Sequence, residues 1–349
     1  MIRKLAASFT IALPLLTPLP PLITPGPSVG PPPAVPAEAW IVVDSASGLV
    51  LAGKEIDTPR PMASVTKILT AIVVVENTDS DEIVTISSRA ADVGESEIGV
   101  VQGERWTVGD LLIAMIVRSG NDAAVALAEH VGGSVDRFAA MMNAEASALG
   151  LKNSHFTNPH GLDDDAHYTT PYDLSVIAKA AIGYPSIAAA ARVRIVQFAD
   201  DPEGNERIAV ATNRLLGTYP GVVGLKTGYT SKANKVLVTV ARTGGREIVT
   251  VVMGSEDHFS DTTELLGWAY ETFGPSERLL ALALPEQGGS GDFTYPPGLP
   301  EDVIARVVGI APLQSASGPP NGFQNSVLAD EIEAWIRLNI PVAAGGADD

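Results

Sequence analysis

The run ILTAIVVVEN, residues 68–77, constrains the fold of this chain more than any other segment. It predicts a helix that is apolar on every side, and such a helix lies in the middle of a structure rather than on its surface. Lys67 nevertheless stands directly before the run, and Ser64 precedes it by about one helical turn. An unpaired ammonium group is costly to bury, so this lysine needs a chemical reason for its position.

Strand-like patterns lie on both sides of a long helical region. WIVVD and LVLAG, joined by SASG, predict a hairpin that begins at Trp40. VVGLKTG, KVLVTVA and EIVTVVMG predict three late strands, with a hairpin turn within ARTGGRE and a closing helix over residues 261–273. This segregation favours an α+β fold, with an antiparallel sheet built from both ends of the chain and a helical insertion between them.

The helical insertion has recognisable starts and stops. Thr107 and Asp110 predict a capping box for the helix TVGDLLIAMIV. A second helix begins near Asp122 and stops at the glycine pair 132–133. Ser134 caps a third helix, VDRFAAMMNAEASAL, whose Phe and Met side chains recur at helical spacing and are expected in the core.

Four regions follow from composition along the chain. Residues 1–24 begin with two basic residues and no acid and continue as an apolar, proline-interrupted stretch, the layout of a secretory signal rather than of a membrane-spanning helix. Residues 25–39 form a proline-rich linker, whose prolines predict an extended chain without packing partners. We expect the folded domain over residues 40–284, and a Gly/Pro-rich tail with one short helix over residues 285–349.

The signal-like start indicates an exported protein, and an uncleaved N-terminal tail without structure is the alternative. Overall charge and composition exclude several other functions. The formal net charge is −18, whereas nucleic acid and anionic membrane surfaces require basic patches, so neither is an expected partner. Absence of cysteine from the sequence excludes disulfides, thiolate metal sites and a cysteine nucleophile.

Ser64 and Lys67, spaced as Ser-x-x-Lys at a helix start, suit acyl transfer. The spacing puts the hydroxyl and the amine on one face, and burial lowers the pKa of a lysine until the amine can act as a base. A serine hydroxyl becomes a good nucleophile once a base takes its proton, and the N–H groups of a helix start stabilise an oxyanion. Taken alone, the pair is better explained by a capping serine and a lysine that extends to solvent.

Two further polar segments occur later in the chain, and their combination with Ser64 and Lys67 arises by chance much more rarely than any one of the three alone. RSGNDAA, residues 118–124, lies between two predicted helices and offers the hydroxyl of Ser119 and the amide of Asn121. LKTGYT, residues 225–230, lies on a predicted strand, where alternation sends Lys226 and Gly228 to one face and Thr227 to the other. The lysine and threonine suit a carboxylate, and the glycine would let a substrate backbone approach the strand. Considered individually, RSGNDAA is consistent with a polar turn between helices, and Lys226 is consistent with an ordinary exposed lysine on an edge strand.

Together, the three elements resemble the signature motifs of the penicillin-binding protein and serine β-lactamase superfamily. In chain order they are Ser64-x-x-Lys67, Ser119-Gly-Asn121 and Lys226-Thr-Gly228. The flanks GESEIGVVQGERWTVGDLL, LGLKNSHFTNPHGLDDDAHYTTPYDL and GLKTGYT are similar to those of low-molecular-weight D-alanyl-D-alanine carboxypeptidases, peptidase family S11. The resemblance covers about residues 40–273 and implies a β-lactamase/DD-peptidase-like fold.

This resemblance implies an acyl-enzyme mechanism without a metal or organic cofactor. Ser64 would attack the amide between the last two D-alanines of a peptidoglycan stem peptide, with Lys67 as the base. Ser119 would relay a proton to the leaving D-alanine, and Asn121 would orient Lys67 and the peptide amide. β-Lactams would act as covalent inhibitors.

Substrate-binding residues follow from the same resemblance. The backbone N–H groups of Ser64 and Tyr229 would form the oxyanion hole, and Lys226 and Thr227 of the strand motif would hold the terminal carboxylate. Arg214, in TNRLL, is a further candidate contact for that carboxylate.

His160 and Asp173 match recurrent family positions near the site, where either residue is catalytic or structural. Membrane contact is expected at most through the N-terminal segment, because the candidate helix at 329–340 carries acidic residues that anionic lipid would repel.

Alternative functions share the same motifs. A β-lactamase of the type with a Ser-x-Asn element uses a glutamate for deacylation, and the corresponding region here, HFTNPHGLDDD, has none. A DD-endopeptidase would use identical residues and differ only in the pocket for its leaving group. A non-catalytic peptidoglycan- or penicillin-binding protein would not need the complete set of reactive residues.

Overall fold

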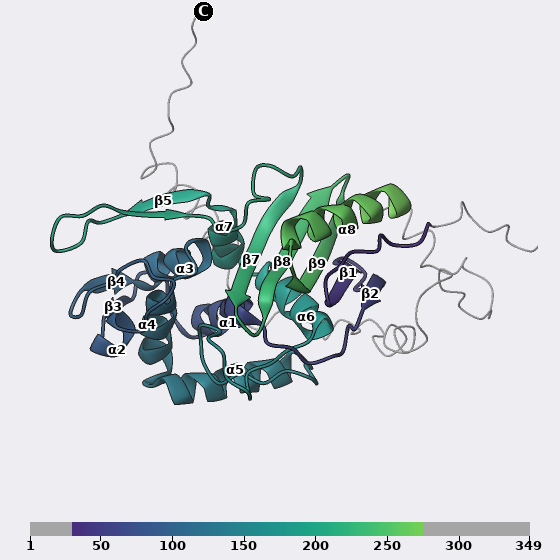
Figure 1. Ribbon diagram of the computed structural model, residues 1–349. Coiled ribbons are helices and arrows are strands. Elements are labelled where there is room, and N and C mark those ends of the chain that lie inside the picture. The colour runs from purple at the N-terminus through teal and green to yellow at the C-terminus, as the bar shows by residue number, and fades with distance from the viewer. Residues whose placement is uncertain (1–29, 275–349) are drawn as a thin grey trace, which may run out of the picture.

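Strands from both ends of the chain meet in one sheet, as Figure 1 shows for the computed structural model, which describes residues 30–274. All neighbouring strands of this five-stranded sheet are antiparallel. In spatial order they are β2 (Val50–Lys54), β1 (Ala39–Asp44), β9 (Arg246–Ser255), β8 (Asn234–Thr243) and β7 (Val222–Thr230). The predicted α+β fold, with a sheet from both chain ends and a helical insertion, is confirmed.

The insertion between β2 and β7 contains most of the helices. In chain order the helices are η1 (Ala63–Thr66, a 3₁₀ turn), α1 (Lys67–Asn77), α2 (Ser88–Ala91), α3 (Val108–Val117), α4 (Asn121–Gly132), α5 (Val135–Ala148), α6 (Pro171–Ala181), α7 (Pro185–Arg192) and, after the sheet, α8 (His258–Phe273). Two small hairpins accompany them. Their strands are β3 (Ile83–Thr85) with β4 (Arg105–Thr107), and β5 (Ile195–Phe198) with β6 (Arg207–Val210).

Helices cover both faces of the sheet. Along β8, Val236 and Val238 pack into the core on the side of the insertion, whereas Leu237 and Ala241 pack with α8 on the other side. Because both faces are buried, the central strands are apolar at almost every position instead of alternating with polar residues. The sheet therefore forms a rigid support for whatever its edge strand β7 carries.

Helix α1 is the central helix that its all-apolar sequence predicts. Residues 67–74 are all buried, and other helices of the insertion surround α1 on the side away from β7 (Figure 1). The 3₁₀ turn η1 precedes α1 and packs against β7, so the start of the helix faces the edge strand.

Predicted helix boundaries agree closely with the structure. The side chain of Thr107 caps α3 by accepting the N–H of Asp110, and α4 ends at Gly133 in a left-handed conformation. Helix α8 begins three residues before the predicted start, because Asp257 caps it and accepts the N–H of Ser260. The hairpin turn between β8 and β9 lies at Gly244 and Gly245 as predicted.

Expectations for the chain ends fall mainly outside the described residues. These include the signal-like segment 1–24, the start of the linker (residues 25–29), and the tail 285–349 with its helix at 329–340; the described part of the folded domain ends at Gly274. The expectation that the linker has no packing partners is wrong at its described end. Val35 and Ala37 are buried against α8 and the sheet, since they share a hydrophobic cluster with Leu265.

No single helix within residues 30–274 is long and apolar enough to cross a membrane. By length and composition, α6 and α7 taken together are the only helices of the described part that pass such a test, and the two are bent by 104° where they meet.

Candidate active site

The nucleophile candidate Ser64 lies in a strained turn between α1 and the edge strand β7. Ala63, directly before it, has a φ of 50°, a left-handed conformation that an L-residue adopts only where its surroundings hold it. A Cβ added to Gly228 of β7 would lie 3.0 Å from the Ser64 nitrogen and 3.0 Å from the Ala63 Cβ. Gly228 is therefore needed for the approach of the protein's own chain, and not only for that of a substrate backbone.

The amine of Lys67 contacts three oxygen atoms. Its Nζ lies 3.0 Å from the Ser64 Oγ, 2.8 Å from the Asn121 Oδ1 and 2.7 Å from the backbone oxygen of His160. The two carbonyl oxygens can only accept hydrogen bonds, so they take two N–H groups. A neutral amine then directs its lone pair at the Ser64 hydroxyl, which is the arrangement a base needs.

Electrostatics favour that neutral amine. The pKa of Lys67 is well below its ordinary value, first because the side chain is fully buried and second because the charge of Lys226 is near. The carboxylates of Asp122 and Glu95 act in the opposite direction. Burial dominates, so the lysine can accept a proton from Ser64 and return it later.

Lys226 and Thr227 of the strand motif face different neighbours, as the alternation predicts. Lys226 is 1% exposed, and burial lowers its pKa to about 7. Its Nζ donates to the Thr227 backbone oxygen at 3.0 Å. The Thr227 hydroxyl lies 2.6 Å from the hydroxyl of Thr212, a residue that the sequence did not single out.

The Ser-Gly-Asn motif lies at the junction of α3 and α4. Ser119 is buried with a φ of 69°, and its hydroxyl makes no hydrogen bond to another residue of the described chain. Asn121 is the first residue of α4, and besides Lys67 it contacts the backbone oxygens of Gly94 and Ser96 through its side-chain amide and its backbone N–H. The loop that contains Gly94 and Ser96 therefore holds Asn121 on the side away from Lys67.

Asp122 anchors the loop and was recognised in the sequence only as a helix start. Its buried carboxylate accepts the backbone N–H groups of three successive residues, Ile98, Gly99 and Val100. A buried acid next to a turn-rich segment was the available signal, but the sequence alone does not reveal which N–H groups it binds.

His160 and Asp173 occupy different settings. His160 contacts Lys67 through its backbone oxygen, while its Nδ1 accepts the N–H of Leu162 and burial lowers its pKa to about 3. Asp173 holds the backbone N–H of Asn153 and the hydroxyl of Ser154 near the start of α6.

Arg214 is not brought to the three motifs. Its guanidinium lies over the ring of Phe259 in α8, 5.8 Å from the ring centre, and the side chain is exposed. In this segment it is Thr212 that hydrogen-bonds to β7, through the hydroxyl of Thr227. Tyr229 continues β7, with its side chain 66% exposed beside the site.

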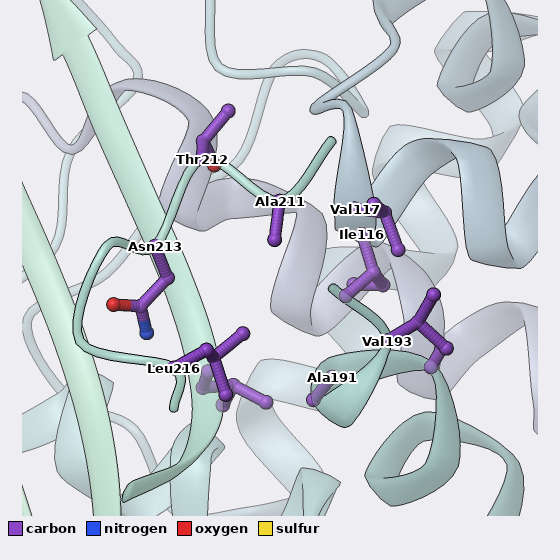
Figure 2. A pocket seen from close by; sticks show the side chains of 10 residues that line it. Ile116, Val117, Ala191, Val193, Ala211, Thr212, Asn213 and Leu216 are labelled. Atoms are coloured by element: carbon purple, nitrogen blue, oxygen red, sulfur yellow. The ribbon is translucent and has the colours of Figure 1, made fainter. Parts of the chain in front are cut away.

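A small pocket lies beside this segment rather than at the motifs (Figure 2). Apolar side chains from α3, α7 and β7 form its walls, and Thr212 and Asn213 add polar groups. None of Ser64, Lys67, Ser119, Asn121 and Lys226 lines it. Within residues 30–274, no group of three or more His, Asp or Glu side chains is arranged to hold a metal ion.

Comparisons with known proteins agree on one family. Residues 27–257 match the family model described as D-alanyl-D-alanine carboxypeptidase. The carboxypeptidase DacF of Bacillus subtilis is 35% identical over 245 residues, and the match covers 68% of this chain and 63% of DacF. For DacB2 of Mycobacterium tuberculosis, the identity is 36% over 248 residues, covering 67% of this chain and 82% of DacB2.

Solved structures with the same fold include the Streptomyces K15 DD-transpeptidase. Its TM-score is 0.65 at 31% identity, and the match covers 69% of this chain and 100% of that one. A penicillin-binding protein homolog from Mycobacterium tuberculosis gives a TM-score of 0.66 at 34% identity, over 78% of this chain and 100% of that one.

Proposed function

The chain belongs to the D-alanyl-D-alanine carboxypeptidase family, peptidase family S11, and we propose that it removes the terminal D-alanine from peptidoglycan stem peptides through an acyl-enzyme on Ser64. One observation supports this most: the buried amine of Lys67 binds two obligate acceptors and leaves its lone pair for the Ser64 hydroxyl. A protein that only bound the peptide would have no use for a buried, activated base beside a serine.

Acylation begins with proton transfer from Ser64 to Lys67 while the Ser64 Oγ attacks the carbonyl carbon of the penultimate D-alanine. Negative charge develops on the carbonyl oxygen, and the backbone N–H groups of Ser64 and Tyr229 stabilise it. The C–N bond then breaks, and the hydroxyl of Ser119 gives a proton to the leaving amine. Ser119 regains a proton from the Lys67 ammonium.

The terminal carboxylate of the substrate is held by the strand motif. A protonated Lys226 supplies positive charge and the Thr227 hydroxyl supplies a hydrogen bond. Asn121 binds Lys67 through its Oδ1 and so keeps the base directed at Ser64. Water finally attacks the ester, with its proton passing to Lys67, and releases the shortened peptide with Ser64 restored.

β-Lactams should acylate Ser64 and leave slowly. No carboxylate within residues 30–274 hydrogen-bonds to Ser64 or Lys67, so a glutamate-assisted deacylation of the β-lactamase kind has no acid in place. Asp163, from the HFTNPHGLDDD region, binds the hydroxyl of Thr230 instead. We therefore expect inhibition rather than turnover. From the signal-like residues 1–24, we place the activity outside the cytoplasm, at the peptidoglycan.

The activity is tested by D-alanine release. A purified full chain is incubated with a synthetic stem pentapeptide that ends in D-Ala-D-Ala, and free D-alanine is measured. Release by the wild type and none by Ser64→Ala is the expected result. Release without dependence on Ser64, or no release at all, would contradict the proposal.

The same assay separates related reactions. The chain is 31% identical to a protein named a DD-transpeptidase. Hydrolysis and transpeptidation would proceed from the same acyl-enzyme, so the assay should also be run with an amine that can accept the acyl group. Added glycylglycine should leave hydrolysis dominant for a carboxypeptidase, whereas a transpeptidase would form the peptide adduct. Cross-linked dimeric stem peptide as the substrate tests for endopeptidase activity.

A further inference from the structure

A buried imidazole that the proposed reaction does not use lies behind the nucleophile turn. His167 is 3% exposed, and its two ring nitrogens are both engaged. Nε2 lies 2.7 Å from the hydroxyl of Thr66, and Nδ1 lies 3.0 Å from the backbone nitrogen of Thr157, which donates to it. Thr66 belongs to the η1 turn, two residues after Ser64.

These contacts fix the direction of a hydrogen-bond chain. The backbone N–H of Thr157 can only donate, so Nδ1 of His167 accepts and the ring proton is on Nε2. Nε2 therefore donates to the Thr66 hydroxyl, and that hydroxyl donates to the backbone oxygen of Ala63 at 2.9 Å. Burial lowers the pKa of His167 to about 4, which keeps the ring in the neutral form that this chain requires.

The chain ends on the peptide group that joins Ala63 to Ser64. A peptide group is planar, so the direction of the Ala63 C=O also sets the direction of the Ser64 N–H. Ala63 holds its left-handed conformation at this point. Gly161 of the loop packs closely against the same carbonyl: a Cβ at this position would lie 1.9 Å from the Ala63 oxygen, so no side chain fits there.

We propose that His167, acting through Thr66, is a positioning residue that sets the orientation of the Ala63–Ser64 peptide and so directs the Ser64 N–H into the oxyanion hole. The loop of residues 157–167 then serves the site twice. Its His160 backbone oxygen orients the base, and its His167 orients the oxyanion donor. The catalytic consequence rests on the proposed function; the conformational one does not.

Thr70 provides a matched control on the same helix. It lies one turn after Thr66, is fully buried, and its hydroxyl also binds the loop, donating to the Pro159 backbone oxygen at 2.7 Å. It makes no hydrogen bond to Ala63. Thr70→Val should therefore loosen the contact between helix and loop without reorienting the Ser64 peptide.

The first test compares acylation rates in the full chain. Since loss of an oxyanion donor costs about 100- to 1,000-fold, we expect a misdirected donor in Thr66→Val to slow acylation by benzylpenicillin at least ~10-fold. Thr66→Ser should recover most of the rate. Thr70→Val loosens the loop at Pro159, next to the His160 oxygen that binds Lys67, so it measures the cost of loosening the loop alone and should slow acylation less than Thr66→Val even where its Tm falls equally. Equal slowing in Thr66→Val and Thr70→Val, or a wild-type rate in Thr66→Val, would overturn the proposal.

A second pair of variants tests the imidazole. His167→Gln can still donate to Thr66, whereas His167→Asn keeps an acceptor near Thr157 and is too short to reach Thr66. We expect the Gln variant to acylate faster than the Asn variant by about 10-fold, and equal rates would count against the proposal.

Hydrogen exchange separates failure of this inference from failure of the proposed function. Amide exchange of the peptide containing residues 62–67 should be faster in Thr66→Val and His167→Asn than in Thr70→Val, whether or not penicillin reacts. Unchanged exchange in both would reject the positioning role. A wild type that penicillin does not acylate, with the exchange difference present, would reject only the enzymatic proposal.

Discussion

Two buried lysines with different tasks share one site, and their pKa values should be visible in the pH dependence. In the proposed mechanism, Lys67 must be neutral to take the proton of Ser64, whereas Lys226 must be charged to hold a carboxylate. Burial lowers both pKa values, that of Lys226 to about 7. Base and binding group therefore make opposite demands on pH.

We accordingly expect kcat/KM for a D-Ala-D-Ala peptide to rise with pH as Lys67 loses its proton. It should fall again above about pH 7, where Lys226 loses its own proton and with it the charge that binds the carboxylate. An uncharged fluorophosphonate that reacts with Ser64 needs no carboxylate contact. Its rate should show only the rising limb. A falling limb near the same pH with both reagents would show that Lys226 is not its source.

Gly228 is predicted to be intolerant of any side chain. A Cβ there would lie 3.0 Å from backbone and side-chain atoms of Ser64 and Ala63, so the turn would have to shift. Because misplacement by about 1 Å can cost 100-fold in rate, we expect Gly228→Ala to lose about that much acylation rate and ~1–3 kcal/mol of unfolding free energy.

The matched control for Gly228→Ala is Gly267→Ala in the middle of α8, where an added Cβ meets nothing within 4 Å. It should stabilise the protein by about 0.5–1 kcal/mol, since alanine is the better helix former, and leave acylation unchanged. Rapid acylation of Gly228→Ala would show that the close approach of η1 to β7 is not required.

At the scale of elements, the loop of residues 94–100 is tied to α4 by the carboxylate of Asp122. Asp122 accepts three of its N–H groups and thereby holds the loop against Asn121. Asp122→Asn would direct an NH₂ group at backbone donors, and we expect a loss of about 2–3 kcal/mol in unfolding free energy. We also expect at least ~10-fold slower acylation, because Asn121 loses its support.

Asp173→Asn is the comparison for that variant. Asp173 is also a buried acid that binds a loop N–H, at Asn153, but it does so at the start of α6. Its replacement should cost similar stability with little change in acylation, measured by thermal unfolding and penicillin labelling. If Asp173→Asn slowed acylation as strongly as Asp122→Asn, a loop-specific role for Asp122 would be excluded.

Elements with strong local patterns were predictable from the sequence, and those defined by tertiary contact were not. The all-apolar run 68–77 and the caps at Thr107 and Ser134 give local signals that packing does not override. The hairpin of β5 and β6 was missed because its strands have four residues each, with an acidic turn between them. Arg207 of β6 forms an ion pair with Glu104, which lies about a hundred residues earlier in the sequence, and this contact anchors the hairpin.

The same division applies within the site. The spacing of Ser64 and Lys67 predicts that these two lie together, and the resemblance of the three motifs to a known family predicts that Asn121 joins them. Thr212 and His167 act through contacts across 15 and 101 residues of sequence, which no local pattern encodes. Arg214 was a candidate through the resemblance of TNRLL to the family, but the direction of a side chain after a turn depends on the packed chain around it.

For the whole molecule, buried histidines predict sensitivity to acid. Burial holds the pKa of His160 at about 3 and those of His167 and His258 at about 4. In the unfolded chain these groups titrate near 6.5, so between about pH 6.5 and 4 the unfolded state binds more protons than the native state. Unfolding free energy should therefore fall as the pH drops through this range.

His160 and His167 should each contribute on the order of 3 kcal/mol to that loss, and the less buried His258 should contribute less. Chemical denaturation at pH 7 and pH 4.5 measures it, and His167→Gln should show a smaller difference between the two than the wild type. A pH-independent unfolding free energy over this range would mean that these imidazoles are not held neutral in the folded protein.

The central claim is that Ser64 is the nucleophile and Lys67 its base, and intact-protein mass spectrometry after incubation with benzylpenicillin tests it most directly. We predict one penicilloyl group, located on the peptide that contains Ser64, stable over minutes and absent from Ser64→Ala. An unmodified protein that consumes penicillin would indicate a β-lactamase. An unmodified protein that leaves penicillin intact would contradict the claim.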